Sequence, residues 1–278
     1  RYHTVADDRD TYSAQVMQTN LNTFGALAIY LDQTPALALD LNATCDDLQE
    51  ALETTLAGED AQPYLDALDA LRNAAQAHQE EIAAINAQYQ DALDEKADQQ
   101  TLDEIRERGR ALNAKTLDAF RFVQEQFIGI ISTSDIVIKH VAYQNNVDVI
   151  EGVIAALEEG VLSNEEGSGA LDLAWMINGG AEYGYYSFST ETNAASLATL
   201  QEESNPGNLF WGTDKGSVLA QTYPATVSLL EKAESEDGDF AEEIAVYAKE
   251  QAQQERYLQE MIRQETDAMQ ELTQMLGA

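Results

Sequence analysis

Long runs of helical periodicity, with almost no helix-breaking residues, most constrain the fold of this chain. Only 4 of the 278 residues are proline, and aliphatic side chains recur every three or four positions over most of the length. This spacing places apolar side chains on one face of a helix, which can then be buried against a neighbour. We therefore predict an all-α fold, a helical bundle over nearly the whole chain.

Turn residues divide this pattern into separate helices. The first predicted helix runs over residues 13–32 and ends before Thr34-Pro35, because proline disfavours helix in the residue that precedes it. A second helix is expected over residues 45–56. The apolar residues of the first helix form a stripe that we expect to be buried: Val16, Leu21, Phe24, Leu27, Ala28 and Leu31.

Two long amphipathic segments occupy the middle of the chain. Residues 63–96 and 101–127 each carry a continuous apolar stripe, and a short polar turn joins them. This arrangement predicts two antiparallel helices packed as an αα-hairpin. Further helices are expected over residues 147–159, 217–233 and 240–276.

The chain is strongly acidic, with 50 acidic and 15 basic residues and a formal net charge of −35. Binding to nucleic acid or to an anionic membrane needs basic side chains, so both partners are excluded for this segment. Residues 46–98 alone contain 14 acidic and 2 basic side chains, which we interpret as a solvated helix face. The acid excess fits a halophile and an extracytoplasmic bacterial protein equally well.

Most motifs of common enzymes are absent from the sequence. There is no GxSxG, GxGxxG or P-loop pattern, and the single cysteine, Cys45, cannot form an intrachain disulfide. No run of about 18 apolar residues predicts a membrane span. The chain begins at Arg1 without a signal peptide, and we expect it to be part of a longer polypeptide.

The three histidines have different surroundings. We predict that His78, in a polar helix, is exposed to solvent, and that His140, in an apolar run, is a structural histidine with a satisfied ring. His3 lies in a polar loop just before a helix. A loop histidine can present a ring nitrogen to a metal while carboxylates orient the ring. The carboxylates near His3 are Asp7, Asp8 and Asp10.

Three segments, taken in order, resemble one enzyme family. Tyr2-His3-Thr4, followed by "VADDRDTYS" and a helix, resembles the last metal-ligand segment of the co-catalytic zinc exopeptidases, which include aminopeptidase Y and glutamate carboxypeptidase II. Residues 38–53 resemble the link into the helical dimerisation domain that glutamate carboxypeptidase II shares with the transferrin receptor. Residues 120–144 resemble the point in that domain where a long helix gives way to a turn.

The resemblance implies roles for three residues. His3 would bind one of two zinc ions, Tyr2 would line the substrate pocket, and Asp7 would orient a ligand. The general base and the other zinc ligands would lie upstream, so we expect no tight zinc binding and no peptide hydrolysis by this chain alone. Residues 1–40 would end an α/β catalytic domain, and 41–278 would form a helical domain, dimerisation-like over 41–160 with an additional helical region over 161–278.

Two functions therefore stand as hypotheses. In the first, the chain is the C-terminal part of a zinc metallopeptidase. There it forms a homodimer and supports the active site of an upstream catalytic domain that acts on peptides. In the acid-preferring carboxypeptidases of this family, a longer loop after this stretch carries a lysine that binds the terminal carboxylate of the substrate, whereas here residues 144–146 lead from Tyr143 straight into the next helix without a lysine. The resemblance therefore favours an aminopeptidase-like activity. We expect the parent protein to be extracellular or in a bacterial cell envelope. In the second, the chain is a non-catalytic helical interaction module from a receptor-like relative.

Aromatic residues gather in two segments of the C-terminal half. Such side chains either fill a core or anchor an interface, where they bury a large area at a small entropic cost. For this chain the alternative to a packed core is an interface, or a lid over the catalytic domain. The candidate residues are Trp175, Tyr183, Tyr185, Tyr186, Phe210 and Trp211.

Overall fold

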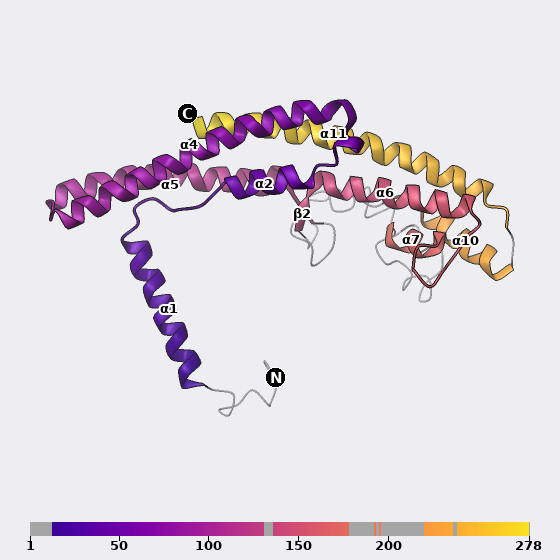
Figure 1. Cartoon of the computed structure of the whole chain (residues 1–278), viewed down its shortest axis with the longest axis horizontal. Coiled ribbons are helices and arrows are strands. Elements are labelled where there is room, and N and C mark those ends of the chain that lie inside the picture. The colour runs from indigo at the N-terminus through magenta and orange to yellow at the C-terminus, as the bar shows by residue number, and fades with distance from the viewer. Residues whose placement is uncertain are drawn as a thin grey trace. The chain divides into compact units, whose positions relative to one another are not determined.

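The computed structural model describes residues 13–130, 136–177, 192, 195, 220–235 and 238–277, and within them the fold is all-α apart from one short β-hairpin (Figure 1). This confirms the predicted fold class. The described helices are α1 (Ala14–Asp32), α2 (Asn42–Ala51), α3 (Thr54–Ala57), the 3₁₀ turn η2 (Gly58–Asp60), α4 (Ala61–Asp94), α5 (Gln99–Gln126), α6 (Lys139–Glu158), α7 (Ala170–Ile177), α10 (Tyr223–Ser235) and α11 (Ala241–Gly277).

The chain divides into two compact units that alternate along the sequence. The first unit combines the described part of residues 1–40 with Ala75–Ala119, and the second combines Leu41–Ala74 with Phe120–Ala278. Helices α4 and α5 each contribute to both units. The division into domains at residue 40 that the sequence suggested stays a prediction.

In the first unit, α4 and α5 form the predicted antiparallel hairpin. Gln88 on α4 accepts a hydrogen bond from Arg108 on α5 at 2.9 Å, and the guanidinium of Arg106 lies 5.1 Å from the ring centre of Tyr89. The turn between the helices contains Lys96 at φ +55°, in the left-handed region that ends a helix. Asp98 then caps α5 by accepting hydrogen bonds from the amide and hydroxyl of Thr101, both at 2.9 Å.

The core of this hairpin follows a regular stripe on each helix. Alternating steps of three and four residues keep one face of each helix turned toward the other. On α4 the stripe consists of His78, Ile82, Ile85, Tyr89 and Ala92. On α5 it consists of Leu102, Ile105, Gly109, Leu112 and Thr116.

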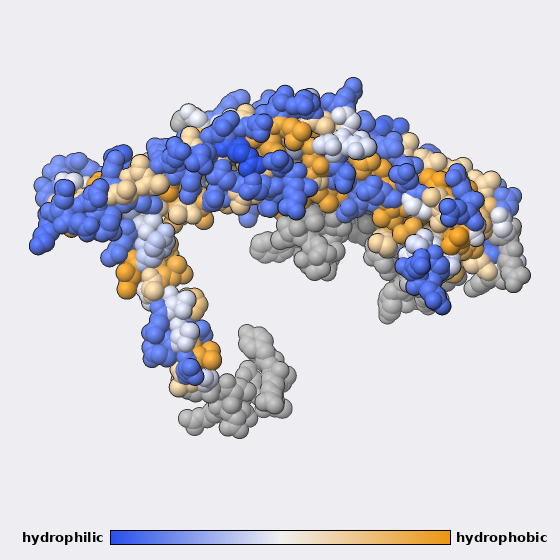
Figure 2. All heavy atoms as spheres, viewed as in Figure 1, coloured by the Kyte–Doolittle hydropathy of each residue, from blue (hydrophilic) through white to orange (hydrophobic). Residues whose placement is uncertain are grey.

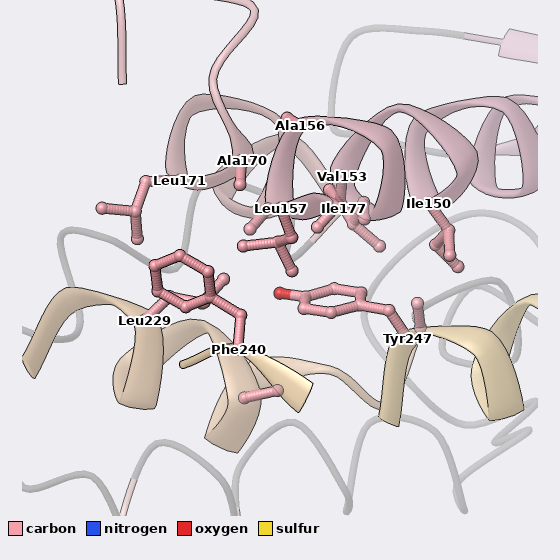
Figure 3. Close-up of a cluster of buried hydrophobic side chains, with 13 residues drawn as sticks. Ile150, Val153, Ala156, Leu157, Ala170, Leu171, Ile177, Leu229, Phe240 and Tyr247 are labelled. Carbon is pink, nitrogen blue, oxygen red and sulfur yellow. The ribbon is translucent and has the colours of Figure 1, made fainter. Parts of the chain in front are cut away.

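In the second unit, α11 lies along α6, and α7 and α10 cover one end of the pair (Figure 1). Tyr247 extends from α11 toward Leu157 of α6, beside Phe240 (Figure 3). Its hydroxyl pairs with that of Thr226 on α10 at 2.9 Å, so this buried phenol keeps a hydrogen-bond partner. The β-hairpin joins the ends of α5 and α6 and consists of β1 (Ile128–Ile130) paired antiparallel with β2 (Ile136–Ile138).

One predicted helix is interrupted in the structure. Residues 45–56 were expected to form one helix, but α2 ends at Ala51, and α3 begins after Leu52 and Glu53. Gln144 of α6 accounts for the break. Its side-chain amide donates to the Ala51 carbonyl and accepts from the Glu53 N–H, both at 2.9 Å, and so replaces two helical hydrogen bonds.

The expectation of a buried face on the first helix was wrong. Helix α1 has the predicted bounds, and Ser13 caps it by accepting a hydrogen bond from the Val16 amide at 3.3 Å. No residue of α1 is buried, and Phe24 is 67% exposed. Helical periodicity shows that an apolar face exists, but it does not show that the same chain covers it. Among the described residues, no helix has the length and apolar character needed to cross a membrane.

Candidate functional site

Helix α1 exposes many apolar side chains and carries no charged residue before Asp32. Residues 13–31 contain no Asp, Glu, Lys or Arg, although 23% of the whole chain is charged. Figure 2 shows apolar side chains exposed along this helix. The large apolar side chains of α1 that are at least 45% exposed are Val16, Met17, Leu21, Phe24, Leu27, Ile29, Tyr30 and Leu31. Exposed apolar side chains grouped in this way mark an interaction surface.

A second candidate site lies where residues 35–37 meet the α4–α5 hairpin. Asn86 of α4 accepts a hydrogen bond from the Ala36 N–H at 2.9 Å and donates one to the Ala36 carbonyl at 2.8 Å. Asn113 of α5 accepts from the Leu37 N–H at 2.6 Å and donates to the Pro35 carbonyl at 3.0 Å. Two side-chain amides thus bind four consecutive backbone groups of one short segment.

Gly109 allows this segment to come close to α5. A Cβ atom at position 109 would lie 2.5 Å from the carbonyl oxygen of Pro35 and 2.6 Å from its carbonyl carbon. Both are backbone atoms, which cannot rotate away as a flexible side chain can. Ala36, the central residue of the segment, is fully buried against the apolar cluster of the hairpin.

His78 is buried, so the prediction that it is exposed was wrong. It belongs to the stripe of α4 residues that face α5, and only 3% of its surface is exposed. Nε2 lies 2.8 Å from Thr116 Oγ1, and because that hydroxyl donates to the Leu112 carbonyl, Nε2 carries the proton and donates to it. Nδ1 has no partner among the described residues. Burial, followed by the charge of Lys115, lowers the pKa of His78 below 6.5.

His140 is buried, as predicted, but only one side of its ring is satisfied, because Nε2 has no partner among the described residues. Its Nδ1 lies 2.6 Å from Oε2 of Glu265, and its backbone N–H donates to Oε1 at 3.1 Å. The carboxylate from α11 thereby caps the first turn of α6. The hydroxyl of Tyr64 lies 3.4 Å from the same Oε2, and burial together with Glu265 raises the pKa of Tyr64. The side chains of His140 and Glu265 are 0% exposed, which indicates a structural network without substrate access.

A shallow acidic pocket of about 380 Å³ lies between α2 and α6. Asp47, Glu50, Glu53 and Asp148 line it, together with Gln144 and Asn145. Burial, followed by the charges of Glu53 and Glu151, raises the pKa of Asp148. Within the described ranges, no group of three or more His, Cys, Asp or Glu side chains is placed to hold a metal ion.

Most residues singled out from the sequence lie outside the described residues. These are the proposed zinc-site residues Tyr2, His3 and Asp7, and the aromatic residues Tyr183, Tyr185, Tyr186, Phe210 and Trp211. Trp175 is described. It lies on α7, is partly buried, and its ring centre is 6.3 Å from that of Tyr223. Its role as an interface or lid residue stays a prediction.

The searches for similar proteins returned nothing. No protein-family model, no curated protein and no solved structure matches this chain.

Sequence reasoning missed the residues that hold the 35–37 segment. Asn86, Asn113 and Gly109 each lie in a helical pattern, where asparagine and glycine are less favourable than alanine. Of these three residues, only Gly109 gives a sequence signal for the contact. A glycine at a core step inside a long helix indicates a close backbone approach, but the pattern does not name the partner.

Proposed function

We propose that the chain is a helical interaction module that associates with a second copy of itself through α1. The observation that carries this proposal is the spacing of exposed apolar residues on α1. Met17, Leu21, Phe24, Ala28 and Leu31 follow one another at steps of four, three, four and three. This is the heptad spacing with which one helix packs along another.

The opposite side of α1 is mainly polar, although it includes Ile29, which lies seven residues after Asn22 and is 62% exposed. It carries Gln15, Gln18 and Asn22, and the Gln18 amide donates to the Asn22 side chain at 2.8 Å. The two faces together make an amphipathic helix with no ionised group before Asp32. Such a helix gains free energy by burying its stripe, and the polar amides need only remain in contact with water.

Charge favours a second copy as the partner. Two copies, each with a net charge of −35, repel each other over most of their surfaces. The uncharged segment 13–31 can meet its own counterpart without placing like charges opposite each other. A basic partner would find no counter-charge on this stretch, so electrostatic pairing does not favour it there.

The size of the stripe predicts a weak dimer. Met17, Leu21, Phe24 and Leu31 are 45%, 61%, 67% and 48% exposed. With on the order of 100 Å² available from each of these four side chains, two paired helices bury roughly 800 Å² in total. Stable interfaces bury about 1,200–2,000 Å², so we expect association at micromolar or higher concentrations.

Sedimentation of the whole chain from about 1 to about 200 µM tests the proposal. We expect the mass to rise above the monomer value of 30.5 kDa as the concentration increases. Leu21→Glu, on the stripe, should abolish the rise. The matched control Asn22→Glu adds the same charge on the polar face and should leave it. A chain that stays monomeric throughout, or two variants that behave alike, would refute the proposal.

A second proposal concerns a parent polypeptide and is supported by the Tyr2-His3-Thr4 motif. In this hypothesis the chain ends a zinc-dependent, aminopeptidase-like exopeptidase, and residues 41–160 resemble a transferrin-receptor-like dimerisation domain. His3 would be one zinc ligand among several supplied upstream. Calorimetric titration of this chain with zinc should then show no tight binding, because a zinc site needs three or four ligands. Stoichiometric sub-micromolar binding would contradict this assignment of ligands.

A further inference from the structure

The apolar stripe of α1 contains side chains of very different sizes, and their order along the helix suits one orientation of a helix pair. The stripe continues one step before Met17, to Ala14, so it spans almost the whole of Ala14–Asp32. A second helix can lie along this stripe in either direction. We propose that the α1 helices of two copies pair antiparallel, which rests on the association proposed above and specifies its geometry.

Antiparallel pairing matches large side chains with small ones. When the two helices overlap along their whole length, each residue of the stripe faces a residue from the other end of the stripe on the second copy. The facing pairs are Ala14 with Leu31, Met17 with Ala28, and Leu21 with Phe24. Both outer pairs combine a large and a small side chain, which lets the layers interdigitate and fill the space between the helices.

Parallel pairing places each residue opposite its own counterpart. Two Phe24 rings would then meet in one layer, and two Ala28 methyl groups would meet in the next. Two alanines between layers of phenylalanine and leucine leave space unfilled, and an unfilled space in a packed interface costs free energy. The sizes of the side chains therefore favour the antiparallel pair.

The one charged residue of α1 lies at its C-terminal end. Asp32 is the last residue of the helix, which has no acidic residue in its first turn and no basic residue in its last turn. A helix is partially positive at its N-terminus and partially negative at its C-terminus. Antiparallel pairing brings each Asp32 beside the N-terminal end of the second helix, where Ser13 is the N-cap. Parallel pairing would bring two Asp32 carboxylates together at two partially negative ends.

Most of the negative charge of the chain follows α1. Residues 33–278 contain 46 acidic and 13 basic side chains, whereas residues 1–12 contain three and two. Hydrogen bonds of Ala36 with Asn86 and of Leu37 with Asn113 attach the chain to the α4–α5 hairpin soon after α1 ends, so this acidic part begins close to that end.

The length of α1 makes the orientation matter for repulsion between the two copies. Its 19 residues span about 28 Å at a rise of 1.5 Å per residue. Charges in water at physiological ionic strength are screened over about 8 Å. Antiparallel pairing makes the acidic parts of the two copies leave the helix pair at opposite ends, whereas parallel pairing would start both at the same end.

Mixtures of charged variants of the whole chain test the orientation. Leu21→Lys and Phe24→Glu each place a charge on the stripe, so each variant alone should sediment as a monomer at about 200 µM. In an antiparallel pair of one copy of each, Lys and Glu face each other, and the second contact between Leu21 and Phe24 stays apolar. We therefore expect the equimolar mixture to associate about tenfold more tightly than either variant alone. All residues of α1 are exposed, so these changes leave the buried core untouched.

The matched control is an equimolar mixture of Leu21→Lys and Leu21→Glu. It contains the same two charges, but the changed residues face each other only in a parallel pair, so it should not associate. Restored association in the control mixture, or none in the test mixture, would overturn the proposal. A wild-type chain that stays monomeric would instead refute the association itself, which is a different result from a wrong orientation.

Disulfide trapping gives a second measurement without charged substitutions. Met17→Cys and Ala28→Cys face each other only in the antiparallel pair, so mild oxidation of their mixture should give mainly the mixed disulfide, identified by intact mass. Asn22→Cys with Thr23→Cys, at the same level on the polar side of α1, is the control and should give little product. The native Cys45 is buried and should not react. A share of mixed disulfide no larger than random pairing gives, from a chain that does associate, would contradict the antiparallel pair.

Discussion

The buried pair of His78 and Thr116 offers a sharp test of the hairpin core. Thr116→Val keeps the shape of the side chain and removes only its hydroxyl, which is fully buried and accepts the Nε2–H of His78 at 2.8 Å. Helix geometry already supplies the Leu112 carbonyl with a backbone partner, so the unpaired imidazole N–H dominates the cost. An unsatisfied buried donor costs about 1–3 kcal/mol, which is the expected loss in free energy of unfolding.

Replacement of the histidine completes a double-mutant cycle. His78→Leu removes an imidazole whose Nδ1 has no described partner and places an apolar side chain between Ala75 and Ile82 on the α4 stripe. In the Thr116→Val background this second change should restore most of the lost stability, because two apolar residues then face each other. We expect a coupling of about 1–2 kcal/mol between the two positions, measured by urea unfolding followed by far-ultraviolet circular dichroism.

The same pair should make stability depend on pH. The folded-state pKa of His78 lies below 6.5, so the unfolded chain binds more protons in the window just below that value. The free energy of unfolding should therefore fall as the pH drops from about 6.5 toward the folded-state pKa, by up to about 1.4 kcal/mol per pH unit. Lys115 supports this direction and Glu81 opposes it. Identical pH profiles for wild type and His78→Leu, or additive single variants, would refute the reasoning.

Three further outcomes are expected. Gly109→Ala should expose the amides of Ala36 and Leu37 to hydrogen exchange, because a Cβ at 2.5 Å from the Pro35 carbonyl oxygen displaces the segment; retained protection would contradict this. Glu265→Ala should lower the free energy of unfolding, measured with urea, by about 3–5 kcal/mol, because it leaves the buried His140 ring without its partner at 2.6 Å. Glu260→Ala, on the exposed side of α11, is the control and should change the free energy of unfolding little. Asp148→Asn should raise stability at neutral pH, because the raised pKa of this carboxyl shows that its charged form is disfavoured in the fold. The gain should stay below about 1 kcal/mol, because solvent screens this exposed group, and a loss of stability would argue against repulsion in the pocket.

The helices were predictable because their signals are local. The bounds of α1 and the turn between α4 and α5 follow from apolar spacing and from proline and polar residues close by in sequence. Burial of α1 was not predictable in this way. Its stripe at Leu21 and Phe24 has the pattern of a core face, and pattern alone does not distinguish a face covered within the chain from one left for a partner.

Histidine in the α4 stripe shows how the sequence can mislead. His78 stands between Ala77 and Gln79 in a helix rich in polar residues, and this polar character suggested that it is exposed. Its spacing, three residues after Ala75 and four before Ile82, places it on the buried stripe instead. Spacing was the better guide because burial in a helix depends on the face that a residue occupies, whereas the character of its immediate neighbours in sequence reports on other faces.

Side-chain amides are the recurring means by which this chain holds irregular backbone against helices. Asn86 and Asn113 hold residues 35–37, and Gln144 bridges the break after Ala51. An amide can donate and accept at once, so it replaces the pair of hydrogen bonds that a segment loses when it leaves a helix. A carboxylate only accepts, and in a chain with a net charge of −35 it would also add repulsion. Side-chain amides are thus the polar groups best suited to this task here. Their partners lie 50 to 93 residues away in sequence, which is why local patterns did not reveal them.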